Sequence, residues 1–267
     1  MILFPNAKIN IGLYITEKRP DGFHNLESCF FPIDWQDILE IIPSKTKSTF
    51  SSSGIEIPGN PDSNICLKAY ELLKNKYEIP EVKIHLHKQI PIGAGLGGGS
   101  SDGAYTLKGL NELFNLNLSN EELKNFARQL GSDCAFFIDN KPVFANKKGD
   151  EFEDIEYSLK GYYLYLIYPD IHVSTGEAYS NIKLNPSPID LKKAIAQNPE
   201  NWKDRINNDF EKSIFPNHPK LEILKDNFYK MGAIYASMSG SGSTIYGIFK
   251  EEPKLDNQLK NSKIIKL

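Results

Sequence analysis

The sequence predicts an α+β protein with two domains, and three observations support this expectation. The chain has 267 residues, enough for one large domain or two of ordinary size. Its second half has the order strand, helices, strand, strand, which is typical of a sheet with helices on one face. A polar stretch gives way to an apolar one near residues 159–161, so we expect one domain at residues 1–158 and another at residues 159–267.

The chain begins with alternating polar and apolar residues over positions 2–16, which predicts strands with a break at Pro5. Because side chains on a strand alternate between two sides, Lys8, Asn10 and Gly12 share one side. A lysine and an asparagine placed together either face solvent or bind a ligand.

The loop at residues 17–25 carries a turn signal at residues 20–22, followed by Phe23 and His24. An aromatic ring beside an imidazole suits a site that stacks on a flat base and hydrogen-bonds to it. The alternative is a hydrophobic plug beside a surface histidine.

The remaining elements follow from periodicity and capping signals. Ser119 and Glu122 have the spacing of a capping box, and Gly131 should end the helix that they begin. Further strands are expected at residues 33–43, 49–58, 82–90, 142–145, 162–168, 234–238 and 245–249. Further helices are expected at residues 65–74, from the glycine-rich loop to about 114, from 187, from 207 and at 219–231.

The glycine-rich loop holds five glycines in the seven positions 93–99. Glycine costs backbone entropy when ordered, so such density is expected where the chain takes positive φ or where another group approaches the main chain closely. Ser100 and Ser101 stand where the next helix should begin, and a helix N-terminus offers unpaired N–H groups and a partial positive charge. The order strand, glycine loop, helix therefore predicts a phosphate site.

Other glycine loops fit this stretch less well. A Walker loop has a lysine after its last glycine, whereas Gly99 is followed by serine. A protein-kinase loop returns into a second strand and has companion signatures that the chain lacks. A dinucleotide loop needs an acidic residue about 20 positions later at a strand end, but Glu121 and Glu122 stand at a helix start. A flexible linker would not have tight apolar flanks such as residues 82–90 and 104–114.

Composition indicates which classes of molecule the protein could bind and in which compartment it works. The formal net charge of −3 gives no basic field for nucleic acid, so small-molecule substrates are expected. Cys29, Cys66 and Cys134 are far apart and lack metal-site spacing, which suits a reducing cytosol. Residues 1–18 do not form an apolar leader, and no run is long enough to span a bilayer. We therefore expect a cytoplasmic protein, with its oligomeric state open.

Asp133 lies between a helix terminator and an apolar run, so it should be partly buried. A buried carboxylate needs a partner, for which Lys8 is a candidate; capping the next turn is the alternative. Cys134 lacks an evident histidine partner and should pack as a small apolar residue. His85 and His87 lack a third metal ligand nearby and are expected on the polar side of their strand.

Residues 239–244, SGSGST, join two expected strands. Their small size and hydroxyl groups predict a second phosphate nest, with a simple hairpin turn as the alternative.

These stretches resemble the motifs of the GHMP small-molecule kinases, named for galactokinase, homoserine kinase, mevalonate kinase and phosphomevalonate kinase. Residues 7–10 resemble their first motif, 91–102 their central phosphate motif and 238–242 their third. The resemblance implies a ribosomal-S5-like N-terminal ATP-binding domain and a ferredoxin-like C-terminal domain.

Residues 8–13, 21–24 and 131–133 resemble the GHMP kinases that phosphorylate a cytidine diphosphate-linked methylerythritol on the non-mevalonate isoprenoid route. The implied reaction moves the γ-phosphoryl group of ATP to the 2-hydroxyl of the methylerythritol portion. In such an enzyme Asp133 would orient the hydroxyl and accept its proton late, and Lys8 would hold that aspartate ionised.

The resemblance also implies the binding residues. Mg²⁺ would accompany ATP near Ser100 or Ser101, without a cage of protein ligands. Asn10 would face the erythritol, Phe23 and Tyr179 would sandwich the cytosine, and His24 would hydrogen-bond to it. The implied ATP-binding residues are Asn64 and Lys88 on the adenine side and, around the phosphates, Pro91, Ile92, Gly93, Ala94, Gly95, Leu96, Gly97, Gly98, Gly99, Ser100 and Ser101.

Two positions depart from the pattern. Phe23 stands where tyrosine is common, so a ring hydroxyl is lost while stacking is kept. Ala94 stands where glycine is common, which restricts positive φ there.

Three rival functions remain at this point. Another GHMP kinase, for mevalonate, homoserine or a sugar, would have little use for two flat rings. A catalytically silent metabolite-binding relative would be expected to have lost Lys8 or Asp133. A dinucleotide-binding oxidoreductase is the third.

Overall fold

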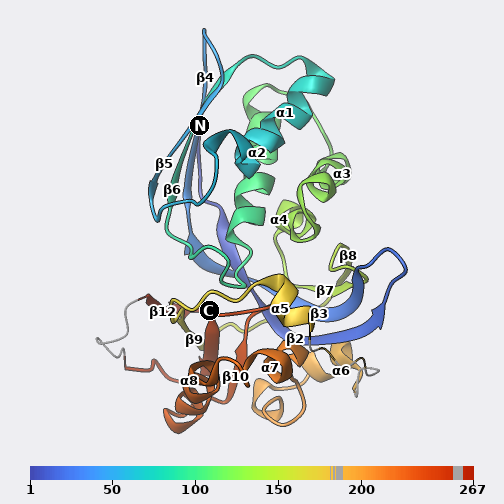
Figure 1. The fold of residues 1–267 in the computed structure, drawn as a ribbon, viewed down its shortest axis with the longest axis vertical. Helices are drawn as coiled ribbons and strands as arrows, with labels where there is room; N and C mark the ends of the chain where they lie inside the picture. The colour runs from blue at the N-terminus through green and yellow to red at the C-terminus, as the bar shows by residue number, and fades with distance from the viewer. Residues whose placement is uncertain (181, 183, 185–188, 255–260) are drawn as a thin grey trace. The chain divides into compact units, whose positions relative to one another are not determined.

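The computed structural model describes the chain except residues 181, 183, 185–188 and 255–260. It forms two compact units, coloured along the chain in Figure 1. The first unit contains residues 1–7, 34–92 and 97–141, and the second contains residues 8–33, 93–96 and 142–267.

The first unit is a four-stranded sheet with helices packed against it (Figure 1). The strand order is β1-β4-β6-β5, in which β5 and β6 are parallel and the other pairs antiparallel. The strands are β1 (Ile2–Leu3), β4 (Ile38–Pro43), β5 (Thr49–Gly54) and β6 (Val82–Lys88). The helices are α1 (Ile65–Tyr77), α2 (Gly98–Leu113), α3 (Asn120–Leu130) and α4 (Phe136–Asp139), with 3₁₀ turns at Pro61–Ser63 and Ser132–Ala135.

Local sequence signals account for the helix boundaries of this unit. Asn64 caps α1 by accepting a hydrogen bond from the backbone N–H of Cys66 at 2.9 Å. Ser119 and Glu122 form the expected capping box of α3, and Gly131 is its C-cap. The strand expected at residues 49–58 ends earlier, at Gly54.

The second unit holds two further four-stranded sheets, with orders β2-β3-β7-β8 and β10-β11-β9-β12. Strands β2 (Asn6–Lys18) and β3 (His24–Gln36) extend slightly into the first unit. The other strands are β7 (Val143–Asn146), β8 (Glu151–Asp154), β9 (Tyr163–Ile167), β10 (Tyr235–Met238), β11 (Ile245–Phe249) and β12 (Ser262–Lys266). The helices are α5 (Thr175–Ser180), α6 (Leu191–Ile195), α7 (Asp209–Ile214) and α8 (Pro219–Lys230), with a 3₁₀ turn at Pro199–Asn201.

The core of this unit joins β2, β9, β10 and β11 to α7 and α8. Phe228 on α8 packs so closely on β11 that a Cβ on Gly247 would lie 3.0 Å from its ring. The helix expected from Ser187 begins outside the described residues, and α6 is capped by Asp190.

The compact units interleave along the chain, unlike the two consecutive domains expected from the sequence. Residues 8–33 and 142–158 pack with the second unit, although they precede the expected boundary. Strand β3 pairs with β7, more than 100 residues further along the chain, and composition does not reveal such pairing. The boundary at residues 158 and 159 stays a prediction.

Candidate functional site

The first motif lies on β2 with its polar side chains buried. Lys8 and Asn10 are only 3% and 2% exposed, so they do not form the solvated strand side that was one interpretation of the sequence. The Lys8 ammonium lies 2.5 Å from Oδ1 of Asn10, and the Asn10 amide donates to Oγ of Ser28 at 2.9 Å. Buried polar groups require such partners, so the pair is held in one arrangement.

The glycine-rich loop takes positive φ at every second residue, at Gly93, Gly95 and Gly97. A side chain on Gly95 would overlap the carbonyl oxygen of Ser239, so this position also needs glycine for space. Ala94 does not have a positive φ, because its glycine neighbours provide the left-handed positions. The departure at Ala94 therefore leaves the loop unstrained at that residue.

Helix α2 begins directly after this loop, with Gly97 as its N-cap and without a capping side chain. Its first N–H groups are therefore available to an anion. Gly99 is exposed, and a Cβ there would meet no protein atom within 4 Å. Neither backbone conformation nor crowding by the described residues requires glycine at this position, and the missing side chain leaves open space beside the first N–H groups of α2.

Ser100 and Ser101 differ in accessibility. Ser100 is half-buried, whereas Ser101 is buried and its Oγ has no hydrogen-bond partner among the described residues. Ser100 is thus the better placed of the two for a ligand at the loop.

The third motif, residues 238–242, contacts the first motif and part of the glycine loop within the second unit. Oγ of Ser239 donates to the carbonyl of Gly95 at 2.8 Å and accepts from the backbone N–H of Asn10 at 3.2 Å. The N–H of Thr244 donates to the carbonyl of Ala94 at 3.2 Å. These bonds bring residues 8–10, 93–96 and 239–244 together, so residues 239–244 are more than a hairpin turn.

Lys88 is buried between two carboxylates of the first unit. Its ammonium lies 2.5 Å from Asp37 and 2.7 Å from Asp102. Burial alone would lower the pKa of Lys88, but the two carboxylates outweigh it and raise the pKa. Burial raises the pKa of Asp102 to about 8 in spite of the neighbouring ammonium, and Oδ1 of Asp102 has no partner among the described residues.

Asp133 and Asn64 both lie in the first unit. Asp133 is half-buried, as expected, in the 3₁₀ turn Ser132–Ala135 after α3. Lys8 belongs to the second unit, so the pairing of these two residues stays a prediction. Asn64 is half-buried at the start of α1. Cys134 is buried, and burial raises the pKa of its thiol to about 12.

Of the three residues proposed for the base, two are in contact with each other within the second unit. The His24 ring lies on that of Tyr179, and the Tyr179 ring also meets Phe210 edge to face. Phe23 stands apart from this stack, 57% exposed, with the Lys148 ammonium 5.3 Å from its ring centre. Burial, followed by the charge of Lys18, lowers the pKa of His24.

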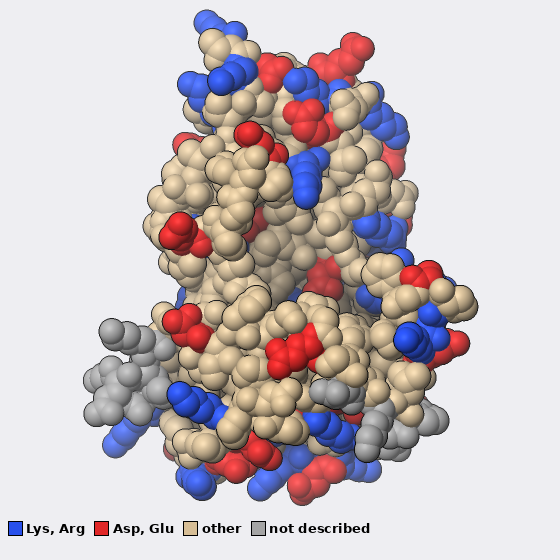
Figure 2. All heavy atoms as spheres, viewed as in Figure 1, with Lys and Arg blue, Asp and Glu red and all other residues tan. Residues whose placement is uncertain are grey.

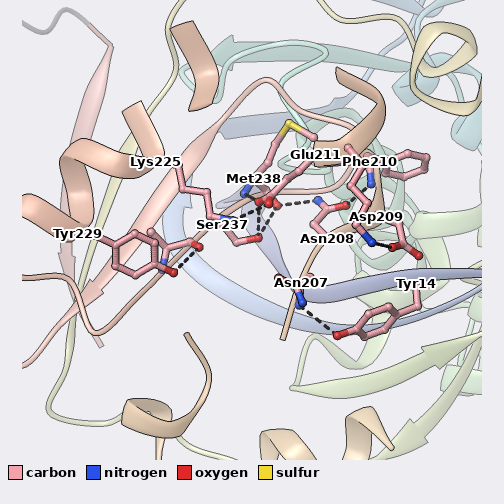
Figure 3. Close-up of polar contacts among 12 residues, drawn as sticks. Tyr14, Asn207, Asn208, Asp209, Phe210, Glu211, Lys225, Tyr229, Ser237 and Met238 are labelled. Atoms are coloured by element: carbon pink, nitrogen blue, oxygen red, sulfur yellow. Dashed lines mark hydrogen bonds and ion pairs between the residues drawn. The ribbon is translucent and has the colours of Figure 1, made fainter. Parts of the chain in front are cut away.

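Sequence reasoning missed Asn208 and Glu211, which hold the third motif (Figure 3). The expected helix start at residues 207–211 was correct, but a capping asparagine looks the same whether or not its amide also donates elsewhere. Asp37 and Asp102 were missed as well. The sequence did contain a signal for a carboxylate partner. The two-residue period of β6 places Lys88 on the buried side with Val82 and Leu86, and a buried ammonium needs an acidic partner.

Among the described residues there is no group of three histidine, cysteine or acidic side chains that could hold a metal ion. His85 and His87 instead contact Ser51 and Ser53. None of the helices in the described ranges is long and apolar enough to cross a membrane. Figure 2 shows acidic and basic side chains interspersed over the face in view.

Two families of known domains match the chain. The GHMP kinases N terminal domain matches residues 64–141, and the GHMP kinases C terminal domain matches residues 185–261. A 4-diphosphocytidyl-2-C-methyl-D-erythritol kinase of Cytophaga hutchinsonii is 53% identical over 95% of this chain and 94% of its own. The enzyme of the same name from Bacteroides fragilis is 53% identical over 96% and 94%.

Solved structures have the same fold. A crystal structure of 4-(cytidine 5'-diphospho)-2C-methyl-D-erythritol kinase matches with a TM-score of 0.77 and 28% identity, over 92% of this chain and 89% of its own. The Methanococcus jannaschii mevalonate kinase matches with a TM-score of 0.72 over 99% and 96%, at 17% identity, which supports the fold alone. The expected two-domain architecture is confirmed by these matches.

Proposed function

We propose the reaction of this protein from its family, since the chain belongs to the GHMP kinases and, within them, to the 4-diphosphocytidyl-2-C-methyl-D-erythritol kinases. It transfers the γ-phosphoryl group of ATP to the 2-hydroxyl of 4-diphosphocytidyl-2-C-methyl-D-erythritol, a step toward isoprenoid precursors. The structural observation that carries the proposal is Gly99, in the first turn of the uncapped helix α2, where none of the described residues requires a glycine.

ATP binds through its phosphates to the loop at residues 91–101. Alternating positive φ at three glycines is a conformation in which backbone N–H groups can form an anion-binding nest, and the uncapped start of α2 offers further N–H groups. Asn64 and Lys88 belong on the adenine side in this proposal. Since Lys88 already serves two carboxylates, its effect on nucleotide binding is to be measured separately from its effect on folding.

Asp133 and Lys8 carry the chemistry in this proposal. The substrate hydroxyl oxygen bonds to the γ-phosphorus, the bond from that phosphorus to the β–γ bridging oxygen breaks, and ADP leaves. Asp133 orients the hydroxyl and takes its proton, while the Lys8 ammonium stabilises the carboxylate. Phosphoryl transfer has a loose transition state, so positioning and charge stabilisation matter more than the strength of the base that takes the proton.

Mg²⁺ would bind beside Ser100, a half-buried residue of the loop, together with the phosphates of ATP, and would neutralise triphosphate charge. Ser101 is the alternative contact, although its Oγ is buried.

The cytidine end binds at the aromatic residues of the second unit. Phe23 offers an exposed ring for stacking, and Tyr179, whose ring is stacked on His24, is the other ring of the proposed sandwich. His24 hydrogen-bonds to the base, and burial, which lowers the pKa of its imidazole, favours the neutral form. Asn10 contacts the erythritol. A cytoplasmic location and the absence of nucleic-acid partners remain part of the proposal.

The test is ATP consumption by purified protein with Mg²⁺ and 4-diphosphocytidyl-2-C-methyl-D-erythritol. The cytidine-free 4-phosphate, mevalonate, homoserine and galactose serve as comparison substrates. Turnover with the cytidine compound alone supports the proposal. Turnover with another substrate would keep the kinase and overturn the base site, and no turnover with any would favour a silent metabolite-binding protein.

A further inference from the structure

The first turn of α7 lies between strand β2 and the third motif, all within the second unit (Figure 3). Asn208, its N-cap, is 2% exposed, and Glu211 is 7% exposed. A buried asparagine and a buried glutamate at one helix start need many polar partners. Those partners show what the turn holds.

Asn208 uses both hydrogens of its amide on the third motif. Nδ2 donates to the carbonyl of Met238 and to that of Gly240, each at 2.8 Å. Oδ1 of Asn208 accepts from the N–H of Phe210 at 3.0 Å, which is the ordinary capping bond. One side chain thus performs two separable tasks, capping α7 and fixing the chain where it leaves β10.

Glu211 holds the same segment from one turn further along. Oε1 accepts from the backbone N–H of Met238 at 2.8 Å and from Oγ of Ser237 at 3.0 Å. Oε2 lies 2.5 Å from the Lys225 ammonium, so the buried charge is paired. Met238 is therefore bound at its N–H by Glu211 and at its carbonyl by Asn208.

The other side of the turn holds β2. The N–H of Leu13 donates to the carbonyl of Asn207 at 2.9 Å, and the N–H of Ile15 donates to Asp209 at 3.0 Å. The Tyr14 hydroxyl accepts from the N–H of Asn207 at 3.1 Å (Figure 3). Residues 207–211 thus fix the position of the third motif relative to the strand that carries Lys8 and Asn10.

The segment held by Asn208 reaches the first motif directly. Ser239, between the two carbonyls that Asn208 binds, accepts from the N–H of Asn10. A Cβ on Gly240 would lie 3.2 Å from Oδ1 of Asn10, the atom that the Lys8 ammonium contacts. A shift of the third motif would therefore move the surroundings of Lys8.

We infer that Asn208 and Glu211 are positioning residues for phosphoryl transfer, which act by fixing the third motif against Asn10 and Lys8. The inference rests on the proposed function, since it assigns Lys8 to the reacting centre. Neither residue is required to touch substrate. Misplacement of a reacting group by about 1 Å can lower a rate on the order of 10²-fold, so loss of the hydrogen bonds from Asn208 or Glu211 to the third motif should lower kcat.

Asn208→Asp separates the two tasks of the side chain. An aspartate keeps the capping oxygen but has no hydrogens to donate, and it turns a carboxylate toward two carbonyls. Asn198→Asp is the matched control, because Asn198 caps a 3₁₀ turn through its oxygen and its side chain is exposed. Each variant is assayed for kcat and for the KM of both substrates. Circular dichroism measures the fraction of each protein that is folded, and kcat is expressed per folded molecule.

We expect Asn208→Asp to lower kcat by about 30- to 100-fold with both KM values changed less than about 3-fold, and Asn198→Asp to match the wild type. Amide hydrogen exchange in residues 237–246 should accelerate in Asn208→Asp alone. Folded Asn208→Asp with wild-type kcat would overturn the inference.

A second pair of variants decides the matter if Asn208→Asp does not fold. Glu211→Gln keeps an oxygen for the N–H of Met238, whereas Glu211→Met has none. Gln should keep kcat within about 3-fold, while Met should lose about 10-fold or more; equal kcat for the two would overturn the inference. Failure of the proposed function is distinct, because the wild type and Asn198→Asp would then be inactive as well.

Discussion

The imidazole of His24 is stacked on the phenol ring of Tyr179, with ring centres 4.6 Å apart and planes 22° from parallel. The Tyr179 ring also meets the Phe210 ring edge to face, with ring centres 4.8 Å apart. Tyr179 is thus fixed by packing, whereas Phe23 is 57% exposed. A base bound here would gain most from covering Phe23.

Phe23→Ala should therefore raise the KM for the cytidine substrate and leave kcat nearly unchanged. Stacking of a base on an aromatic ring contributes about 1–3 kcal/mol, or roughly 5- to 150-fold in affinity. Steady-state kinetics at saturating ATP measure this change. Phe4→Ala is a suitable control, since Phe4 is 51% exposed in the first unit and is not assigned to the base. An unchanged KM in Phe23→Ala would place the base elsewhere.

Asp133→Ala should keep ATP binding and lose turnover. Proton transfer by a positioned side chain contributes about 10²–10⁴-fold, so kcat should fall by that order. Stopped assays of product and calorimetric titration with ATP separate the two effects. Asp34→Ala removes an exposed carboxylate on β3 and should behave as the wild type. Near-normal turnover in Asp133→Ala would remove this residue from its role.

Lys88→Met should destabilise the protein strongly, because it leaves Asp37 and Asp102 buried without their ammonium. Removing one partner of a buried ion pair costs about 3–5 kcal/mol, which urea denaturation can measure. Lys83→Met on the same strand is the control, since Lys83 is exposed. If unfolding free energy stays at the wild-type value while the KM for ATP rises, Lys88 serves the nucleotide rather than the fold.

Cys134 should resist alkylation in the native protein. Its thiol is buried with a pKa raised to about 12, so the reactive thiolate is scarce at pH 8. Mass spectrometry after brief iodoacetamide treatment should find Cys134 unmodified until denaturant is added. Rapid native labelling at Cys134, with loss of turnover, would revive it as a candidate nucleophile.

Much of the fold follows from local signals in the sequence. Asn64, the Ser119–Glu122 capping box and Gly131 place helix ends correctly, because capping depends on residues a few positions apart. The interleaving of residues 8–33 and 93–96 with the second unit could not be predicted, since it depends on pairing between segments far apart.

The site was predictable to the extent that its residues lie in short motifs. The glycine loop is evident from composition alone, whereas composition does not indicate which of its glycines take positive φ. The burial of Lys8 and Asn10 does not, because a polar pair on a strand is equally compatible with solvent. Asn208 and Glu211 escaped notice because their partners, Met238 and Gly240, are backbone groups about 30 positions away in the chain.

Consumption of ATP with 4-diphosphocytidyl-2-C-methyl-D-erythritol, set against its cytidine-free 4-phosphate, tests the central claim most directly. With Mg²⁺ present, the protein should turn over the cytidine compound and give a product phosphorylated on the 2-hydroxyl, while the 4-phosphate gives almost none. Equal turnover of the two compounds would contradict the assignment of the base to Phe23, His24 and Tyr179. Absence of turnover with either, by protein that binds ATP, would contradict the proposed reaction itself.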